Sequence, residues 1–276
     1  MISELKKSEY YKCKGLLYEL GHLEPKAVIE GANPGRVFVD NGHSPRSGLI
    51  WLGNNDGFFF IGDESNKDFN REINVFIDTV IKREALKVGL HWFEGIGNHS
   101  KWNTTLKSVF EHRKLGSWKQ SVYTLQTGDD NINDELAVEN EYRIVKIGED
   151  LLENTNLSII NTEFVRSKIL ESWASSEKFF RHGIGYCMIY KHQIVSICFS
   201  GFVAGNVHGI DIETLEGHQG KKVAQKTALF FVKDCLDNGI VPYWDCMEMN
   251  KPSIAVAEKI GFKNIFNYIG FDFRLN

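Results

Sequence analysis

Residues 213–235, ETLEGHQGKKVAQKTALFFVKDC, place a polar, glycine-bearing bend between a strand-like run and a long helical pattern. The first turn of a helix carries N–H groups without intrahelical partners and the positive end of the peptide dipole, so anions bind there favourably. One interpretation is therefore a cradle for a phosphate group around Gly220. An ordinary strand-to-helix turn is the alternative, because a short glycine motif alone does not decide between the two.

Two carboxylates and a histidine precede this bend on a predicted strand at residues 207–214. Asp211 and Glu213 share one face of that strand, because side chains alternate with a period of two. A partly desolvated carboxylate at this place can accept a proton from an amine, directly or through water. Glu213 is the first candidate for a general base, ahead of Asp211 and His208. A strand-end carboxylate that contacts the loop, and a histidine without a role, are the plain alternatives.

The composition is typical of a soluble globular protein with a substantial core: 276 residues, 42% hydrophobic and 25% charged, with a formal net charge of -4. This charge gives no indication of a nucleic-acid or membrane-surface partner. Residues 1–15 lack the apolar core of a signal peptide, and no apolar run has membrane-spanning length. Five scattered cysteines without paired spacing favour reduced thiols in a cytoplasmic protein and no metal site.

The acidic segment 127–141, TGDDNINDELAVENE, is predicted to link a first lobe of residues 1–126 to a second of residues 142–276. In the first lobe the patterns predict an initial helix, helices at 70–87 and 101–112, and strands at 36–40, 48–52, 57–62, 89–94 and 121–125. In the second they predict helices at 162–173, 223–235 and 252–260, and strands at 142–147, 185–190, 193–202, 207–214, 241–246 and 264–273.

Apolar stripes and a spacing repeat support these elements. A period near 3.6 gives the helix after the bend one apolar face, made of Val223, Ala224, Thr227, Ala228, Phe231, Val232 and Cys235. The helix at 162–173 is predicted to share a face among Phe164, Ile169 and Leu170. Trp92 precedes Asn98 by the six positions that separate Trp244 from Asn250, which suggests two diverged copies of one unit. Trp92, Trp244 and Phe262 are interpreted as core residues.

The second lobe resembles the GNAT superfamily of acyl-CoA-dependent N-acetyltransferases. The resemblance rests on the order of elements and on GHQGKK at 217–222, PYWDC at 242–246, NKPS at 250–253 and GF at 261–262. Residues 214–224, TLEGHQGKKVA, together with AEKIGF at 257–262, look closest to the branch that includes zwittermicin A resistance acetyltransferases. The first lobe looks like a degenerate copy, because residues 62–66 carry two acids and no phosphate loop.

The resemblance implies a mixed α/β (α+β) fold whose mostly antiparallel sheet is flanked by helices, built as a tandem of a degenerate N-terminal GNAT-like lobe and a C-terminal GNAT lobe. It implies acetyl-CoA as the acetyl donor and coenzyme A as the product. The residues that it implies for cofactor binding are Ile212, Thr214, His218, Gln219, Gly220, Lys221, Lys222, Val223, Ala224, Asn250 and Ser253.

Three positions depart from the family pattern. Gly217 replaces the usual Gln or Arg of the phosphate loop, and Lys222 replaces its last Gly or Ala. The Lys222 side chain either crowds the diphosphate or pairs with it through its ammonium group. Ala257 stands where many family members place a tyrosine that protonates the leaving thiolate.

The expected function is an N-acetyltransferase that moves an acetyl group to a primary amine of a small molecule by direct attack on the thioester. Resistance to an amine-bearing antibiotic is one version of it, and Asp63, Glu64, Asp211 and Glu213 would attract a cationic amine. A non-catalytic acyl-CoA sensor or scaffold is the alternative, and a purely structural tandem is the third. The chain is expected to be a monomer or a homodimer.

Overall fold

The computed structural model describes residues 1–18, 21–53, 55, 57–125, 141–153 and 159–275. The chain divides into two compact units. The first comprises Met1–Gln120 with Tyr268–Asn276, and the second comprises Ser121–Asn267. The predicted linker 127–141 lies, up to residue 140, outside the described residues.

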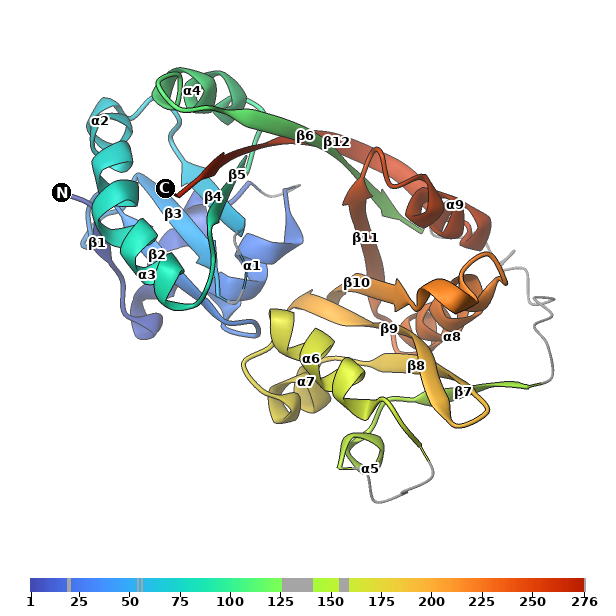
Figure 1. Ribbon diagram of the computed structural model, residues 1–276. Helices are drawn as coiled ribbons and strands as arrows, with labels where there is room; N and C mark the ends of the chain where they lie inside the picture. The colour runs from blue at the N-terminus through green and yellow to red at the C-terminus, as the bar shows by residue number, and fades with distance from the viewer. Residues whose placement is uncertain (19–20, 54, 56, 126–140, 154–158, 276) are drawn as a thin grey trace. The chain divides into compact units, whose positions relative to one another are not determined.

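The first unit is a sheet whose neighbouring strands are antiparallel except for the parallel pair β4 and β5 (Figure 1). In sheet order its strands are β1 (Ser3–Glu4), β2 (Gly35–Val39), β3 (Ser47–Leu52), β4 (Gly57–Gly62), β5 (Trp92–Gly97) and the end of β12 (Lys263–Arg274). Its helices are the 3₁₀ helix η1 (Lys7–Leu16), α1 (Leu23–Glu30), α2 (Lys67–Phe76), the π-helical η2 (Ile77–Ile81), α3 (Lys82–Lys87) and α4 (Trp102–Val109).

Aromatic rings fill the core of the first unit. Phe93 stacks on Phe58 at a centroid distance of 4.2 Å and on Phe273 at 4.9 Å. β5 begins three residues later than the predicted strand 89–94 and includes Gly97. A Cβ at Gly97 would overlap the Trp102 side chain, so this glycine allows the end of β5 to pack closely on α4.

The last strand of the chain completes the sheet of the first unit. Residues Gly270–Arg274 of β12 pair antiparallel with Trp92–Ile96 of β5. Phe271, Phe273 and Leu275 are buried in the first unit's aromatic core. These residues fall in the predicted second lobe, 142–276, because their alternating pattern predicts a strand without indicating its partner.

The second unit is also a mixed, mostly antiparallel sheet flanked by helices, so the predicted fold class is confirmed. In sheet order its strands are the start of β12, the end of β6 (Gly116–Thr124), β11 (Val241–Met247), β10 (Val207–Thr214), β9 (Gln193–Ala204), β8 (Gly185–Tyr190) and β7 (Tyr142–Lys146). Its helices are α5 (Glu149–Leu152), α6 (Thr162–Ser172), α7 (Ser176–His182), the 3₁₀ turn η3 (Glu216–His218), α8 (Val223–Asp237) and α9 (Lys251–Ile260).

β10 and β11 pair for only three residues before they part. The parallel pairing joins Val207–Gly209 to Val241–Tyr243, whereas β10 continues to Thr214 and β11 to Met247. The two strands diverge beyond this point (Figure 1). The backbone groups along the edges that face the gap are therefore available to a ligand.

Most side-chain positions follow the predicted patterns, with clear exceptions. The α8 stripe is buried, apart from the half-buried Ala224. Trp244 and Phe262 are core residues, as predicted. The core prediction for Trp92 is wrong: it is 38% exposed and contacts the Arg274 guanidinium. Leu170 is likewise exposed, because Val165 and Ile169 form the buried face of α6.

Three smaller differences concern elements. α5 and α7 were not predicted, because each is shorter than the window that a helical period needs. β6 begins five residues before the predicted strand 121–125, because the polar residues Lys119 and Gln120 interrupt the alternating apolar pattern at its start. Among the residues that the structure describes, no helix has the length and apolarity that crossing a membrane requires.

We predict that Phe273→Ala lowers the free energy of unfolding of the first unit by about 3 to 5 kcal/mol. The ring is 2% exposed, stacks on Phe93 and lies 4.4 Å from the Arg113 guanidinium carbon. Urea denaturation followed by tryptophan fluorescence measures the change. Ile265→Ala on the same strand is the control, because Ile265 is 49% exposed and should change stability by less than about 0.5 kcal/mol. Equal effects of the two variants would contradict the assignment of β12 to this core.

Candidate active site

A cavity of about 520 Å³ lies where α8 begins. Its walls come from the end of β10, the following loop, the first turn of α8, β11 and α9. The lining residues are Ile212, Thr214, His218, Gln219, Gly220, Lys222, Val223, Ala224, Gln225, Trp244, Asn250, Pro252, Ser253, Ala255, Val256 and Lys259. Every residue that the family resemblance implies for cofactor binding is among them, except Lys221.

Two left-handed residues shape the loop that enters α8. Gly220 has φ of 74° and Lys222, the N-cap of α8, has φ of 62°. Gln219 Nε2 donates a 3.0 Å hydrogen bond to the carbonyl of Thr214, which folds the loop back onto β10. Turns of this kind direct successive N–H groups toward one point, and the first turn of α8 adds further N–H groups without intrahelical acceptors. The loop therefore provides a site that suits an anion.

The opposite wall is fixed by a helix cap. Asn250 Oδ1 accepts a 3.2 Å hydrogen bond from the N–H of Ser253, so Asn250 caps α9 as its residue type predicts. Trp244 Nε1 donates to Ser253 Oγ at 3.0 Å. The buried indole thereby ties the start of α9 to β11, and this holds the cavity wall rigid.

The carboxylates of β10 lie on the other face of the sheet from the cavity. Ile212 and Thr214 line the cavity, so the alternation of the strand directs Asp211 and Glu213 to the opposite face. On that face Lys168 of α6 contacts Glu213 at 2.8 Å. A donor bound between β10 and α8 and an acceptor bound over these carboxylates would therefore approach each other through the gap between β10 and β11.

Lys168 distinguishes the two carboxylates. Its ammonium group contacts Glu213 and also Glu171, which lies 3.0 Å away on α6. The hydrogen bond to Glu213 raises the pKa of Lys168, so the lysine remains charged and paired. Asp211 has a different environment: burial, reinforced by the negative charge of Glu171, raises its pKa to about 6. A carboxyl group with that pKa is ionised at neutral pH and is more basic than an ordinary aspartate.

His208 is placed away from the cavity lining. Its side chain is 5% exposed, and its Nδ1 lies 2.8 Å from Ser200 Oγ. Ser200 Oγ also accepts a hydrogen bond from the N–H of Ile184. Burial lowers the pKa of His208 to about 4. The imidazole is therefore neutral at pH 7 and joins β10 to β9 and to the start of β8.

Ala257, where many family members place a tyrosine acid, is fully buried on α9 and offers no proton. Sequence reasoning missed Lys168 and Glu171 because they lie more than forty residues before Glu213 in the sequence. Their spacing on α6, three residues apart, is typical of an ordinary surface ion pair. No local pattern indicated that Glu213 joins them.

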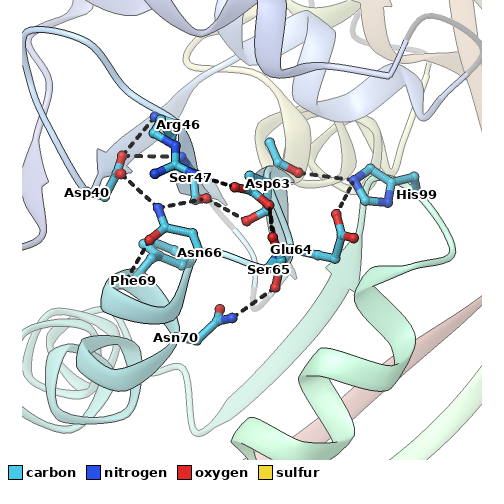
Figure 2. Close-up of polar contacts among 11 residues, drawn as sticks. Asp40, Arg46, Ser47, Asp63, Glu64, Ser65, Asn66, Phe69, Asn70 and His99 are labelled. Carbon is cyan, nitrogen blue, oxygen red and sulfur yellow. Dashed lines mark hydrogen bonds and ion pairs between the residues drawn. The ribbon is translucent and has the colours of Figure 1, made fainter.

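The equivalent bend in the first unit, between β4 and α2, is occupied by its own side chains (Figure 2). Asp63 accepts hydrogen bonds from Ser65 Oγ at 2.6 Å and Ser65 N at 2.9 Å, and from Arg46 at 2.6 Å. These hydrogen bonds, with that of the Ser65 hydroxyl the strongest, lower the pKa of Asp63. Asn66 caps α2 and donates to Asp40 and Ser47. The Asp63 carboxylate therefore accepts the hydrogen bonds that a bound anion would otherwise accept.

β4 and β5 of the first unit also remain paired farther along their length than β10 and β11 of the second unit do. Their parallel pairing joins Gly57 to Glu94 and continues to Phe60 and Gly97. The next N–H, that of Asn98, donates to the carbonyl of Phe60 at 2.9 Å. The first unit thus keeps closed the gap that β10 and β11 open.

A family model described as GNAT acetyltransferase matches residues 18–271. The chain belongs to the GNAT acetyltransferase family. It is therefore an acyltransferase of a family whose acetyl donor is acetyl-CoA. Among curated proteins it is similar to "Uncharacterized N-acetyltransferase YdfB" of Bacillus subtilis (strain 168), with 28% identity over 243 residues that cover 88% of this chain and 87% of that protein.

Solved structures share the fold over the whole chain. A GCN5-related N-acetyltransferase-like protein from Streptococcus suis 89/1591 superposes with a TM-score of 0.70 at 20% identity, covering 97% of this chain and 99% of that one. A tandem GNAT protein from the clavulanic acid biosynthesis pathway gives a TM-score of 0.62 at 12% identity, covering 100% and 98%. The expected tandem GNAT arrangement is therefore confirmed as a fold.

We predict that Lys222→Gly raises the free energy of unfolding by about 0.5 to 1 kcal/mol, because glycine adopts the left-handed conformation without the Cβ penalty. Lys221→Gly is the matched control, since Lys221 lies outside the left-handed region and the same change there should destabilise. Both variants remove one ammonium group, so charge loss cancels in the comparison. Thermal unfolding measures both. Equal shifts of the same sign would contradict the strain at Lys222.

Proposed function

We propose that this GNAT acetyltransferase transfers the acetyl group of acetyl-CoA to a primary amine of a small molecule by direct attack of the amine on the thioester. The cavity at the start of α8 carries this proposal, because it combines an anion-binding helix terminus with the gap between β10 and β11. In the proposed complex the diphosphate accepts hydrogen bonds from N–H groups of residues 220–224. The pantetheine arm lies along Ile212–Thr214, on the edge of β10 that faces the gap. Bound acetyl-CoA supplies an activated acyl group and a thiolate leaving group.

Asp211 is the proposed general base, in preference to Glu213. The Glu213 carboxylate is engaged by Lys168, whereas the pKa of Asp211 is raised to about 6 by burial. In the proposed reaction the amine nitrogen forms a bond to the acetyl carbon, the carbon–sulfur bond breaks, and a proton of the amine passes to Asp211 directly or through water. Solvent protonates the thiolate, because Ala257 provides no acid and a thiol with a pKa near 8.5 leaves without one.

The acceptor is proposed to be cationic. Three carboxylates, those of Asp211, Glu213 and Glu171, surround one ammonium group, that of Lys168, on the face from which the acceptor would approach. This excess of negative charge favours an amine that carries further positive charge. Because residues 214–224 resemble the zwittermicin A resistance branch, amine-bearing antibiotics are the first acceptors to test. The five free, buried cysteines accord with the proposed cytoplasmic location.

A non-catalytic acyl-CoA-binding protein is the second candidate, and the buried Ala257 is the observation that favours it. Both candidates place acetyl-CoA in the same cavity and predict one cofactor per chain, because the bend of the first unit is filled by Asp63. Transfer to an acceptor distinguishes them.

The experiment is a thiol-release assay with acetyl-CoA and a panel of polyamines, amino sugars, peptides and amino acids, with product masses determined. We predict release with at least one cationic amine, and kcat/KM that rises with pH through about 6 as Asp211 ionises. Binding of acetyl-CoA without release over the whole panel would favour the non-catalytic candidate. No binding of acetyl-CoA would contradict both.

Asp211→Asn is predicted to lower kcat/KM by about 100-fold or more and to remove the rise of kcat/KM with pH through about 6, the acidic limb of the pH profile. Glu213→Gln is the matched control and should retain that limb.

The raised pKa of Asp211 also makes the stability of the protein depend on pH. Its neutral form is favoured in the folded state, so its contribution to stability is complete below the pKa of an unfolded aspartate and is lost as pH rises through about 6. Asp211→Asn should therefore stabilise the protein most above pH 6. If Glu213→Gln loses the acidic limb of the kcat/KM profile and Asp211→Asn keeps it, the general base is Glu213 and not Asp211.

A further inference from the structure

One side chain of the cavity, His218, is held by a residue from the far edge of the sheet. The hydroxyl of Tyr142, the first residue of β7, lies 2.7 Å from His218 Nδ1. The two rings meet edge to face, with centroids 5.6 Å apart and planes at 89°. The ring of Tyr190 lies 5.1 Å from His218 and 4.8 Å from Tyr142. This hydrogen bond and these aromatic contacts help to hold the imidazole in place.

The same edge of the sheet anchors both ends of the phosphate loop. Tyr142 is 8% exposed and packs in a buried cluster with Met188, Val195 and Val223, against which Leu215 also packs. Leu215 precedes the loop and Val223 follows it. Residues 216–222 thus span two points of one apolar cluster, and Tyr142 adds a polar contact between them.

The hydrogen bond determines what His218 can offer a ligand. If Nδ1 of the neutral imidazole accepts the hydrogen bond from the Tyr142 hydroxyl, the single ring proton lies on Nε2; in the other tautomer Nδ1 donates to the tyrosine oxygen and Nε2 is an acceptor. In an imidazolium ion both nitrogens carry protons, and Nδ1 donates to the tyrosine oxygen. With Nδ1 accepting, or with the ring protonated, Nε2 carries a proton, and His218 is among the residues that line the cavity.

We propose that Tyr142 is a positioning residue that fixes His218 Nε2–H as a hydrogen-bond donor to the diphosphate of acetyl-CoA. This inference rests on the proposed function. His218 contributes a side-chain donor beside the backbone N–H groups of residues 220–224, and Tyr142 acts only through it. Strand β7 thereby contributes to cofactor affinity although it does not line the cavity.

The test compares Tyr142→Phe with the wild type, by calorimetry with coenzyme A and by kinetics with acetyl-CoA. The variant retains the packed ring and loses only the hydroxyl. We expect the Kd of coenzyme A and the KM of acetyl-CoA to rise about three- to tenfold, the effect of one hydrogen bond, while kcat stays within about twofold. The KM of S-acetylpantetheine, which lacks the diphosphate, should not change. His218→Ala should weaken the binding of coenzyme A by a similar factor. The double variant Tyr142→Phe/His218→Ala should bind coenzyme A no more weakly than His218→Ala alone.

Tyr190→Phe is the matched control. Its ring contacts His218, whereas its hydroxyl interacts with Glu141, so its affinity for coenzyme A should equal that of the wild type. Unchanged coenzyme A affinity in Tyr142→Phe, additive losses in the double variant, or equal losses for S-acetylpantetheine would each overturn the inference while the proposed function stands. If the wild-type protein binds no coenzyme A, the proposed function falls and this inference falls with it.

Discussion

The end of the pairing between β10 and β11 is the constraint on which the site depends. Two parallel strands that remained paired to their ends would satisfy each other's N–H and C=O groups and leave no gap in the sheet. β4 and β5 of the first unit come close to this arrangement, since their pairing continues to Phe60 and Gly97. In the second unit the pairing stops at Gly209 and Tyr243, and the freed edge of β10 leads directly into the loop before α8.

The two faces of the second unit's sheet differ in the charge that they favour. On the α8 face the loop and helix terminus provide N–H donors and the charge of Lys222, which suit an anionic donor. On the α6 face carboxylates predominate, and Lys168 neutralises part of their charge by pairing with Glu213 and Glu171. The reacting groups of the proposed reaction carry opposite charges, so this division would direct each to its own side of the gap.

Local signals in the sequence predicted much of this arrangement. The loop at residues 217–222, the apolar stripe of α8 and the cap at Asn250 lie within short segments, so periodicity and residue type were sufficient to place them. Contacts between distant segments were not accessible in this way. Nothing near Glu213 indicates Lys168, and nothing near His218 indicates Tyr142. The alternating pattern of β12 predicts a strand but does not show that Phe273 packs in the first unit's core.

The crystal structure of the wild-type protein with coenzyme A would test the central claim most directly. The account predicts one molecule per chain, with its diphosphate within hydrogen-bond distance of the N–H groups of residues 220–223 and its thiol at the gap between β10 and β11. A molecule bound at the bend after β4, or a cavity closed by the Lys222 side chain in a protein that binds no coenzyme A, would contradict it.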